Sequence, residues 1–478
     1  MNLLLSVLIL LLQTAKTACF AGDGVKTPDD YNVVMILMET LRRDHLSCYG
    51  YPRKTSPNID KLSAESVVFE NAFAQSSQSL ISAASIFTGL YPPTHGVISG
   101  RNRLDPDIAT LAGELKKRGY KTAAFTAGFF LNHSFGLNSG FEVYKDTRDF
   151  GTFHDILPDA MRWMRENKAK KFFLLVHSYD CHAPYRAPKE FLDRFNKGYD
   201  GILSKVVLDY NLADRVYEDG LYEDFRLKKK VAGLGKRDID YIVSQYDGAV
   251  LYADSYVGRL LSEVEAQGLK DKTLVLFMAS AGEALMDHGT IISSFHGMLY
   301  DEGIHVPLMF RVPGVGAFRA KTEAQLVDVM PTVLDILRVD IPKGAQGITL
   351  KPVLKQTGES IPVRTVYSET PSLATSLPCI GIRKYPWKLI SADGRYELFN
   401  LADDPKEKKN LAEEKPEVLE ARTADLNLFL ASIPRRKVRS DKRPTAIVRE
   451  RMKAMGYWWM DRPRVKSWKK YQHEKSGR

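Results

Sequence analysis

Four apolar runs, each ending in polar residues, constrain the fold of this chain more than any other feature. They are YNVVMILMET (31–40), KTAAFTAG (121–128), KKFFLLVHSYD (170–180) and KTLVLFMASAGE (272–283). Continuous apolar runs of this length are typical of parallel strands that are covered on both faces. Helical patterns lie between them: PNIDKLSAES, DIATLAGELKKRGY and a long amphipathic stretch that ends at Gly268. The alternation predicts an α/β fold, a doubly wound, mostly parallel sheet flanked by helices.

The sequence pattern changes after about Leu354. Short strand-like segments and one helical pattern follow, and they are RTVYSE, CIGIRKYPWKLISADGRYELFNL and KPEVLEARTADLNLFLASI. A chain of 478 residues with 44% hydrophobic residues is long enough for one large domain and a smaller one. We therefore predict an α/β domain over residues 30–354 and a C-terminal α+β subdomain over residues 355–434.

The N-terminus carries an apolar run from Leu3 to Leu12. This run is too short to span a bilayer, and it suits the hydrophobic region of a signal peptide. We predict a signal peptide over residues 1–21 and an exported protein, whether periplasmic, extracellular or attached to the envelope. Lipidation of Cys19 and a buried N-terminal helix are the alternatives that this pattern leaves open.

The positive charge of the chain is concentrated in its C-terminal tail, residues 435–478. The tail has 16 Lys and Arg against 4 Asp and Glu, whereas the whole chain has a net charge of +10, so the rest is close to neutral. A basic tail can contact an anionic lipid, glycan or nucleic-acid surface, or it can be a solvated arm. We predict no specific nucleic-acid partner, and the pattern indicates no particular oligomeric state.

Polar groups stand at the carboxyl ends of three of the predicted strands. They are Glu39 and Thr40 in the first run, His177, Asp180 and His182 in and after the third, and Ser280 and Glu283 in the fourth. In doubly wound sheets the ligand site lies beyond these ends. Each group alone has an ordinary role as a cap or loop residue, but their convergence predicts a polar site here.

Six motifs follow one another along the chain. They are ILMETLRRDHLSCYGYPRKTSPNIDKLSAESVVFENAFAQ, FTGLYPPTHGV, FFLLVHSYDCHAPY, GEALMDHG, HGMLYDEGIHVPLMFRVPG and ELFNLADDPKEKKNLAEEKPE. Together they span Val33 to Glu417 and resemble the sulfatases of the alkaline-phosphatase-like superfamily. The resemblance implies hydrolysis of sulfate or phosphate monoesters, with a divalent cation (calcium or magnesium) on oxygen ligands and a formylglycine nucleophile. The partner that it implies is a sulfated or phosphorylated small molecule or glycan.

The family's nucleophile motif aligns with Ser79. Ile81 stands where the family has Pro or Ala, and Ala83 stands where it has Arg. Since the maturation enzyme reads the Pro and the Arg, we predict no formylglycine at Ser79. An unmodified Ser79 can still attack a phosphorus centre, and its place at a helix start favours a bound anion. The alternative is that Ser79 is simply an N-cap.

The positions that the resemblance assigns to the cation are eroded. The first acidic pair reads Glu39-Thr40, in which Glu39 keeps the charge on a longer side chain. The second reads Ser280-Ala281, where the family has Asp followed by His or Asn. We therefore name Glu39, Thr40 and Ser280 as degenerate metal positions and predict weak binding of a dication.

Two histidines, His182 and His296, match positions that contact substrate in the family. With Ser79 they are the candidate catalytic residues. Near pH 6, where an ordinary imidazole is partly charged, these histidines are expected to hold a sulfate or phosphate group directly. We assign structural roles to His177 and His95.

These substitutions leave three interpretations open. In the first, the chain is a non-catalytic sulfatase-like protein that binds an anion, a glycan or a protein partner. In the second, it is a divergent sulfuric or phosphoric ester hydrolase or transferase that uses an unmodified Ser79. The third is an orthodox metal-dependent sulfatase, and the eroded motifs favour the first of the three.

Overall fold

The computed structural model describes residues 31–436, apart from residues 101, 147–149, 184, 197, 202, 205–234, 289–298, 356–360, 372–377 and 393–394. The predicted signal peptide, nearly all of the basic tail and His296 lie outside the described residues. No helix in the described part of the chain is both long and apolar enough to cross a membrane.

The predicted α/β sheet is present and has eight strands. They are β1 (Asn32–Met38), β2 (Val67–Phe73), β3 (Lys121–Phe125), β4 (Val143–Lys145), β5 (Phe172–Ser178), β6 (Thr273–Ala279), β7 (Leu308–Arg311) and β8 (Phe318–Gln325). Their spatial order is β4-β3-β5-β1-β6-β7-β2-β8. The four apolar runs form the parallel centre, β3-β5-β1-β6, while β7 runs antiparallel to β6 and β2. The predicted fold class is confirmed.

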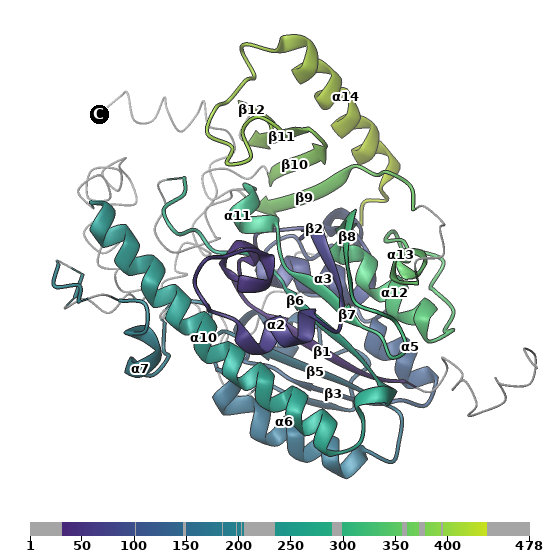
Figure 1. Cartoon of the computed structure of the whole chain (residues 1–478). Helices are drawn as coiled ribbons and strands as arrows, with labels where there is room; N and C mark the ends of the chain where they lie inside the picture. Colours follow the sequence, from purple (N-terminus) through teal and green to yellow (C-terminus); the bar gives the residue numbers. More distant parts are fainter. Residues whose placement is uncertain are drawn as a thin grey trace, which may run out of the picture.

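Helices cover both faces of this sheet (Figure 1). On one face α10 (Lys236–Ala266) packs against α2 (Pro57–Ser63), α6 (Phe153–Asn167) and α7 (Lys189–Leu192). On the other face α3 (Ser79–Thr88) packs against α4 (Pro92–His95), α5 (Leu111–Lys117) and α12 (Val329–Ile336). The short helices α11 (Asp301–Ile304) and α13 (Lys351–Leu354) lie on connections between larger elements.

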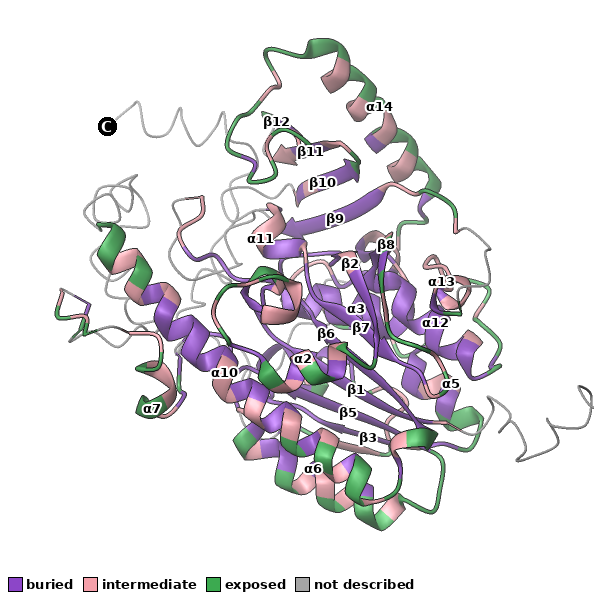
Figure 2. Ribbon diagram, viewed as in Figure 1, coloured by how far each residue is buried: buried purple, intermediate pink, exposed green. Residues whose placement is uncertain are grey.

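The central strands are buried along their whole length. Every residue of β1, β5 and β6 is buried, and Figure 2 shows these strands in one colour beneath helices whose outer faces are exposed. Because both faces of each strand are covered, side chains on both faces must be apolar. This is why the sequence shows continuous apolar runs here. The edge strand β8 (FRAKTEAQ) has several partly or fully exposed residues, and its sequence therefore gave no comparable signal.

A second, smaller sheet follows in the C-terminal part of the chain. It consists of β9 (Val366–Pro371), β10 (Pro378–Lys384), β11 (Trp387–Ala392) and β12 (Arg395–Asn400), all antiparallel. The helix α14 (Pro416–Ser432) packs on this sheet, with Leu426 in one apolar cluster with Leu389 and Leu398 (Figure 1).

A buried lysine joins the smaller sheet to helix α11. Lys388 on β11 is about 1% exposed, and its Nζ lies 2.7 Å from Asp301 Oδ1 and 2.6 Å from Glu407 Oε1. Asp301 begins α11, which precedes β7 of the larger sheet, whereas Glu407 lies between β12 and α14. Lys388 and Glu407 therefore compensate one another in the interior, and the partly exposed Asp301 is the second acid beside the lysine.

Replacing Lys388 with Met would leave Glu407 buried without its cation, whereas Asp301 would keep its ion pair with Arg383. We expect the free energy of unfolding to fall by about 3 kcal/mol or more, because an uncompensated buried charge is costly. Lys384→Met, which removes an exposed partner of Asp425, is the matched control and should cost less than about 1 kcal/mol. Urea unfolding of both variants measures the difference, and equal effects would contradict the role of burial.

Candidate functional site

The carboxyl ends of β1, β5 and β6 meet at one edge of the sheet. The Glu39 amide donates to the Ser178 carbonyl at 3.0 Å, and the Ser280 amide donates to the Met38 carbonyl at 3.0 Å. Parallel strands bring these ends together because all three run in the same direction. The polar convergence predicted from the sequence therefore occurs at this edge.

The Glu39 side chain is the centre of a buried hydrogen-bond network. The Ser79 hydroxyl donates to Glu39 Oε2, and the Ser280 hydroxyl donates to the same oxygen at 2.7 Å. His177 Nε2 lies 2.7 Å from the other oxygen, Oε1. Each of the four side chains is at most 3% exposed. The structure thus brings together Ser79, Glu39 and Ser280, and it adds His177.

His177 is held in one orientation. Its Nδ1 lies 3.3 Å from the Ala127 amide, which can only donate, so the hydrogen of a neutral ring is on Nε2 and is donated to Glu39. Sequence reasoning gave His177 only a structural role and missed this contact. The signal was an imidazole inside an otherwise apolar strand, where a buried polar group needs a partner.

Ser79 is the first residue of α3, and all ten residues of this helix are buried. The helix ends at Gly89, whose φ of 66° is in the left-handed region that favours glycine. Ile81 and Ala83, the two positions at which the sequence predicts a changed nucleophile motif, are both buried.

Thr40 follows Glu39 in a strained conformation. Its φ is 51°, which is rare for a β-branched residue and costs about 1–3 kcal/mol. Tyr246 on α10 holds this turn, because its hydroxyl donates to the Thr40 carbonyl at 2.7 Å and accepts from the Arg42 amide at 2.8 Å. Thr40 Oγ1 is buried and has no hydrogen-bond partner within the described part of the chain.

Glu283 follows β6 and is fully buried. Its Oε1 accepts from the Ala284 amide at 3.0 Å, whereas no partner is found for Oε2 among the residues that the structure describes. Burial raises the pKa of Glu283 to about 8, so this side chain is mainly a neutral acid at pH 7. The loop before it is fixed at Gly282, where a Cβ atom would meet the Glu302 carbonyl at 1.8 Å.

Of the two predicted histidines, His296 lies outside the described residues, and His182 lies beside the Glu39 network. The His182 ring packs 5.4 Å from that of Tyr179, which also contacts His177. His182 Nδ1 donates to the Ala183 carbonyl at 2.7 Å. Burial lowers the pKa of His182 to about 4, so at pH 6 the ring is neutral and gives a bound anion no positive charge.

The cation that the resemblance implies does not fit this donor set. Both carboxylate oxygens of Glu39 are occupied by protein donors, and Ala281 offers only a methyl group. Within the described ranges no group of three or more His, Cys, Asp or Glu side chains can hold a metal ion. Hard dications require several oxygen ligands, preferably charged ones, and one carboxylate among neutral hydroxyls falls short of this.

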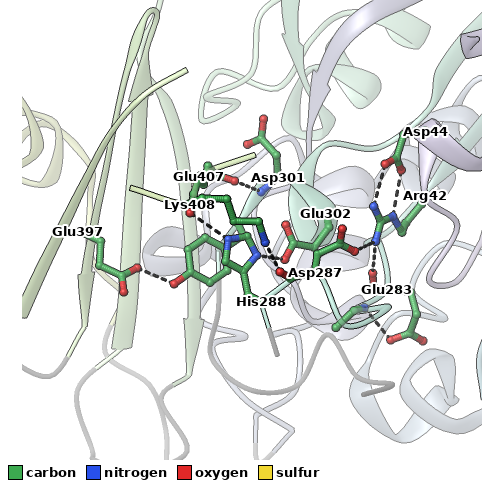
Figure 3. Close-up of polar contacts among 12 residues, drawn as sticks. Arg42, Asp44, Glu283, Asp287, His288, Asp301, Glu302, Glu397, Glu407 and Lys408 are labelled. Carbon is green, nitrogen blue, oxygen red and sulfur yellow. Dashed lines mark hydrogen bonds and ion pairs between the residues drawn. The ribbon is translucent and has the colours of Figure 1, made fainter. Parts of the chain in front are cut away.

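A charged network connects this edge of the sheet to the segment around Glu407 and Lys408, which follows the smaller sheet (Figure 3). Arg42 pairs with Asp44 at 2.7 Å and with Asp287 at 2.5 Å. The next residue, His288, lies 2.5 Å from Glu302 Oε1 through Nδ1 and 3.0 Å from the Glu407 carbonyl through Nε2. Asp287 and His288 are thus engaged in these contacts.

Comparison with known proteins identifies the fold and its lineage. The sulfatase family model matches residues 31–339, which is more than half of the chain. The chain belongs to the sulfatase family. A second model, described as the C-terminal part of N-sulphoglucosamine sulphohydrolase, matches residues 295–428. The family generally uses a divalent cation and formylglycine.

Relatives in this family cover most of the chain. An arylsulfatase of Clostridium perfringens is 23% identical over 444 residues, covering 80% of this chain and 90% of that protein. An N-acetylglucosamine-6-O-sulfatase of Bacteroides thetaiotaomicron is 24% identical over 487 residues, covering 85% and 87%. A structure solved with its substrate D-glucosamine-2-N,6-O-disulfate has a TM-score of 0.69 at 20% identity, covering 85% of this chain and 99% of that one.

Replacing Glu283 with Gln tests whether the buried Glu283 side chain is protonated in the folded protein. The folded pKa of about 8 lies above the ordinary value of 4.5, so the stability from the bound proton is complete below about pH 4.5 and is lost as the pH rises through 8. We expect Glu283→Gln to match the wild type at pH 4 and to be more stable by about 3 kcal/mol at pH 7. Urea unfolding at both pH values measures this, and a difference independent of pH would contradict it.

Proposed function

We propose that this sulfatase-family protein binds a sulfated glycan without hydrolysing it by the family's metal and formylglycine chemistry. The observation that carries the proposal is the network around Glu39. Its two oxygens accept hydrogen bonds from Ser79, Ser280 and His177. The carboxylate that would otherwise bind a cation, and the hydroxyl of the candidate nucleophile, are therefore bonded to each other. Glu39, Thr40 and Ser280 are accordingly proposed as former metal positions.

Electrostatics argue against orthodox turnover at this point. A sulfate monoester is anionic, and without a cation it would approach the acidic side chain of Glu39. Arg42 is already paired with Asp44 and Asp287, and the His182 ring is neutral at pH 6. The sulfate group of a ligand therefore has to lie away from Glu39.

The choice of a sulfated glycan rests on the relatives. One relative is named for N-acetylglucosamine-6-O-sulfate chemistry, and the substrate bound in a structural neighbour is a disulfated glucosamine. Those names describe those proteins, and we extend only their ligand class to this chain. We also propose that residues 1–21 direct export and that the chain divides into domains at residues 30–354 and 355–434. The basic tail, residues 435–478, is proposed to contact an anionic surface.

Metal and cofactor content test this proposal directly. We expect protein purified without added cations to contain no stoichiometric calcium or magnesium, and its thermal midpoint to stay unchanged after treatment with a chelator. Mass spectrometry of the peptide that contains Ser79 should give unmodified serine. Calorimetry should detect binding of D-glucosamine-2-N,6-O-disulfate. Stoichiometric metal together with formylglycine would contradict the proposal and show that the protein is an orthodox sulfatase.

A second candidate function is favoured by one contact, the hydrogen bond from Ser79 to Glu39. A hydroxyl beside a carboxylate that is itself oriented by His177 and Ser280 resembles a nucleophile with its general base. In this alternative the chain is a divergent sulfuric or phosphoric ester hydrolase or transferase. Glu39 would take the Ser79 proton as Ser79 Oγ bonds to sulfur or phosphorus and the S–O or P–O bond to the alcohol or phenol breaks, and the leaving oxygen would take a proton from water.

Turnover of an aryl sulfate and an aryl phosphate separates the two candidates. For a non-catalytic protein we expect wild type and Ser79→Ala to give the same background rate. If Ser79 is the nucleophile, Ser79→Ala should reduce turnover by about a thousandfold or more. Ser85→Ala is the matched control in the same helix, because the Ser85 hydroxyl contacts His95 and has no contact with Glu39.

A further inference from the structure

Four buried polar atoms beyond the carboxyl ends of β1, β5 and β6 have no hydrogen-bond partner within the described part of the chain, and they are Thr40 Oγ1, Asp180 Oδ1, the Tyr185 hydroxyl and Glu283 Oε2. Three of them, those of Thr40, Tyr185 and Glu283, belong to residues that are 1%, 8% and 0% exposed and that are linked through Tyr246 and Arg42. Native proteins pair nearly all buried polar groups, because an unpaired one costs about 1–3 kcal/mol. Several such groups in one region therefore point to a ligand that completes them.

Tyr246 and Arg42 contact the residues that carry these three atoms. Tyr246 bonds to the Thr40 carbonyl at 2.7 Å, and its ring packs edge-on against that of Tyr185 at 5.8 Å between centroids. The Arg42 guanidinium donates from Nη1 to the Glu283 carbonyl at 3.3 Å, and the Arg42 backbone amide donates to the Tyr246 hydroxyl. Burial, and then the charge of Glu283, raise the pKa of the Tyr185 hydroxyl, which places the two side chains within electrostatic reach.

We propose that Thr40, Tyr185 and Glu283 form a subsite for the uncharged hydroxyl groups of a sugar ring. The inference rests on the proposed glycan-binding function and specifies which part of the ligand these residues contact. In Figure 3 the Glu283 side chain turns away from the guanidinium of Arg42, so its second oxygen is not used by the charged network. Nothing in the family assignment gives these three side chains a common ligand.

The chemistry of the three groups selects an uncharged, hydrogen-bonding ligand. Two hydroxyls and a carboxyl group can both donate and accept, as the hydroxyls of a sugar do. A sulfate or phosphate placed here would find no cation free to neutralise it, because Arg42 is already paired with Asp44 and Asp287. A cation would find one acid, two neutral hydroxyls and the nearby positive charge of Arg42. An apolar ligand would leave all three atoms unpaired.

Matched variants that remove single hydroxyls test the subsite. Tyr185→Phe and Thr40→Val keep the shape of each side chain, and valine is β-branched like the threonine it replaces. We expect each variant to raise the Kd of D-glucosamine-2-N,6-O-disulfate and of unsulfated N-acetyl-D-glucosamine roughly tenfold, the effect of one lost hydrogen bond. Tyr144→Phe is the control, because its hydroxyl already donates to the Leu131 carbonyl at 2.7 Å, and it should leave both Kd values unchanged.

The outcomes separate this inference from the proposed function. If the disulfate binds equally well to wild type, Tyr185→Phe and Thr40→Val, the subsite is wrong and glycan binding stands. If only the unsulfated sugar binds, and the two variants weaken it, the subsite stands and sulfate recognition is wrong. If neither sugar binds to the wild type, both proposals are overturned.

The ligand-free protein gives an independent measurement. Because the Tyr185 hydroxyl has no protein partner, we expect Tyr185→Phe to leave the thermal midpoint unchanged or to raise it, whereas Tyr144→Phe should lower it. Equal losses in the two variants would show that ordered water already satisfies the Tyr185 hydroxyl. That result would overturn the assignment of this group to a sugar.

Discussion

The compensation of one buried acid, Glu39, determines how this end of the molecule is organised. A carboxylate removed from water must be hydrogen-bonded or paired, and here the partners are two hydroxyls and an imidazole. They come from the start of α3, from the interior of β5 and from the turn after β6. The arrangement therefore depends on the correct assembly of three segments that are distant in the sequence.

The turn that follows Glu39 is held in place by further hydrogen bonds and ion pairs. Tyr246 on α10 holds the strained backbone of Thr40, and Arg42 is fixed by Asp44 and Asp287. The loop that carries Asp287 and His288 is then bonded to the segment around Glu407 of the C-terminal subdomain. The smaller sheet is thus linked to the polar site by hydrogen bonds and ion pairs.

The hydroxyl and methyl groups of Ser280, Ala281 and Ala83 limit which ligands we expect this edge of the sheet to bind. A dication needs several charged oxygens, and a bound sulfate needs positive charge. Ser280, Ala281 and Ala83 supply neither. Neutral groups such as Thr40, Tyr185 and the mainly protonated Glu283 are suited to hydroxyl-bearing ligands. This difference in chemistry is the physical basis of both proposals.

The sequence by itself determined the fold class, since buried parallel strands require continuous apolar runs that can be read directly. It also placed Glu39 and Ser280 at one edge, because the carboxyl ends of parallel strands converge there, whereas Ser79 was added by the resemblance to the sulfatases. Only the tertiary structure decided that His177 donates to Glu39, that burial makes His182 neutral and Glu283 mainly a protonated acid, and that the Tyr185 ring packs against Tyr246. These properties depend on burial and on contacts between distant segments, and neither is visible in the local sequence.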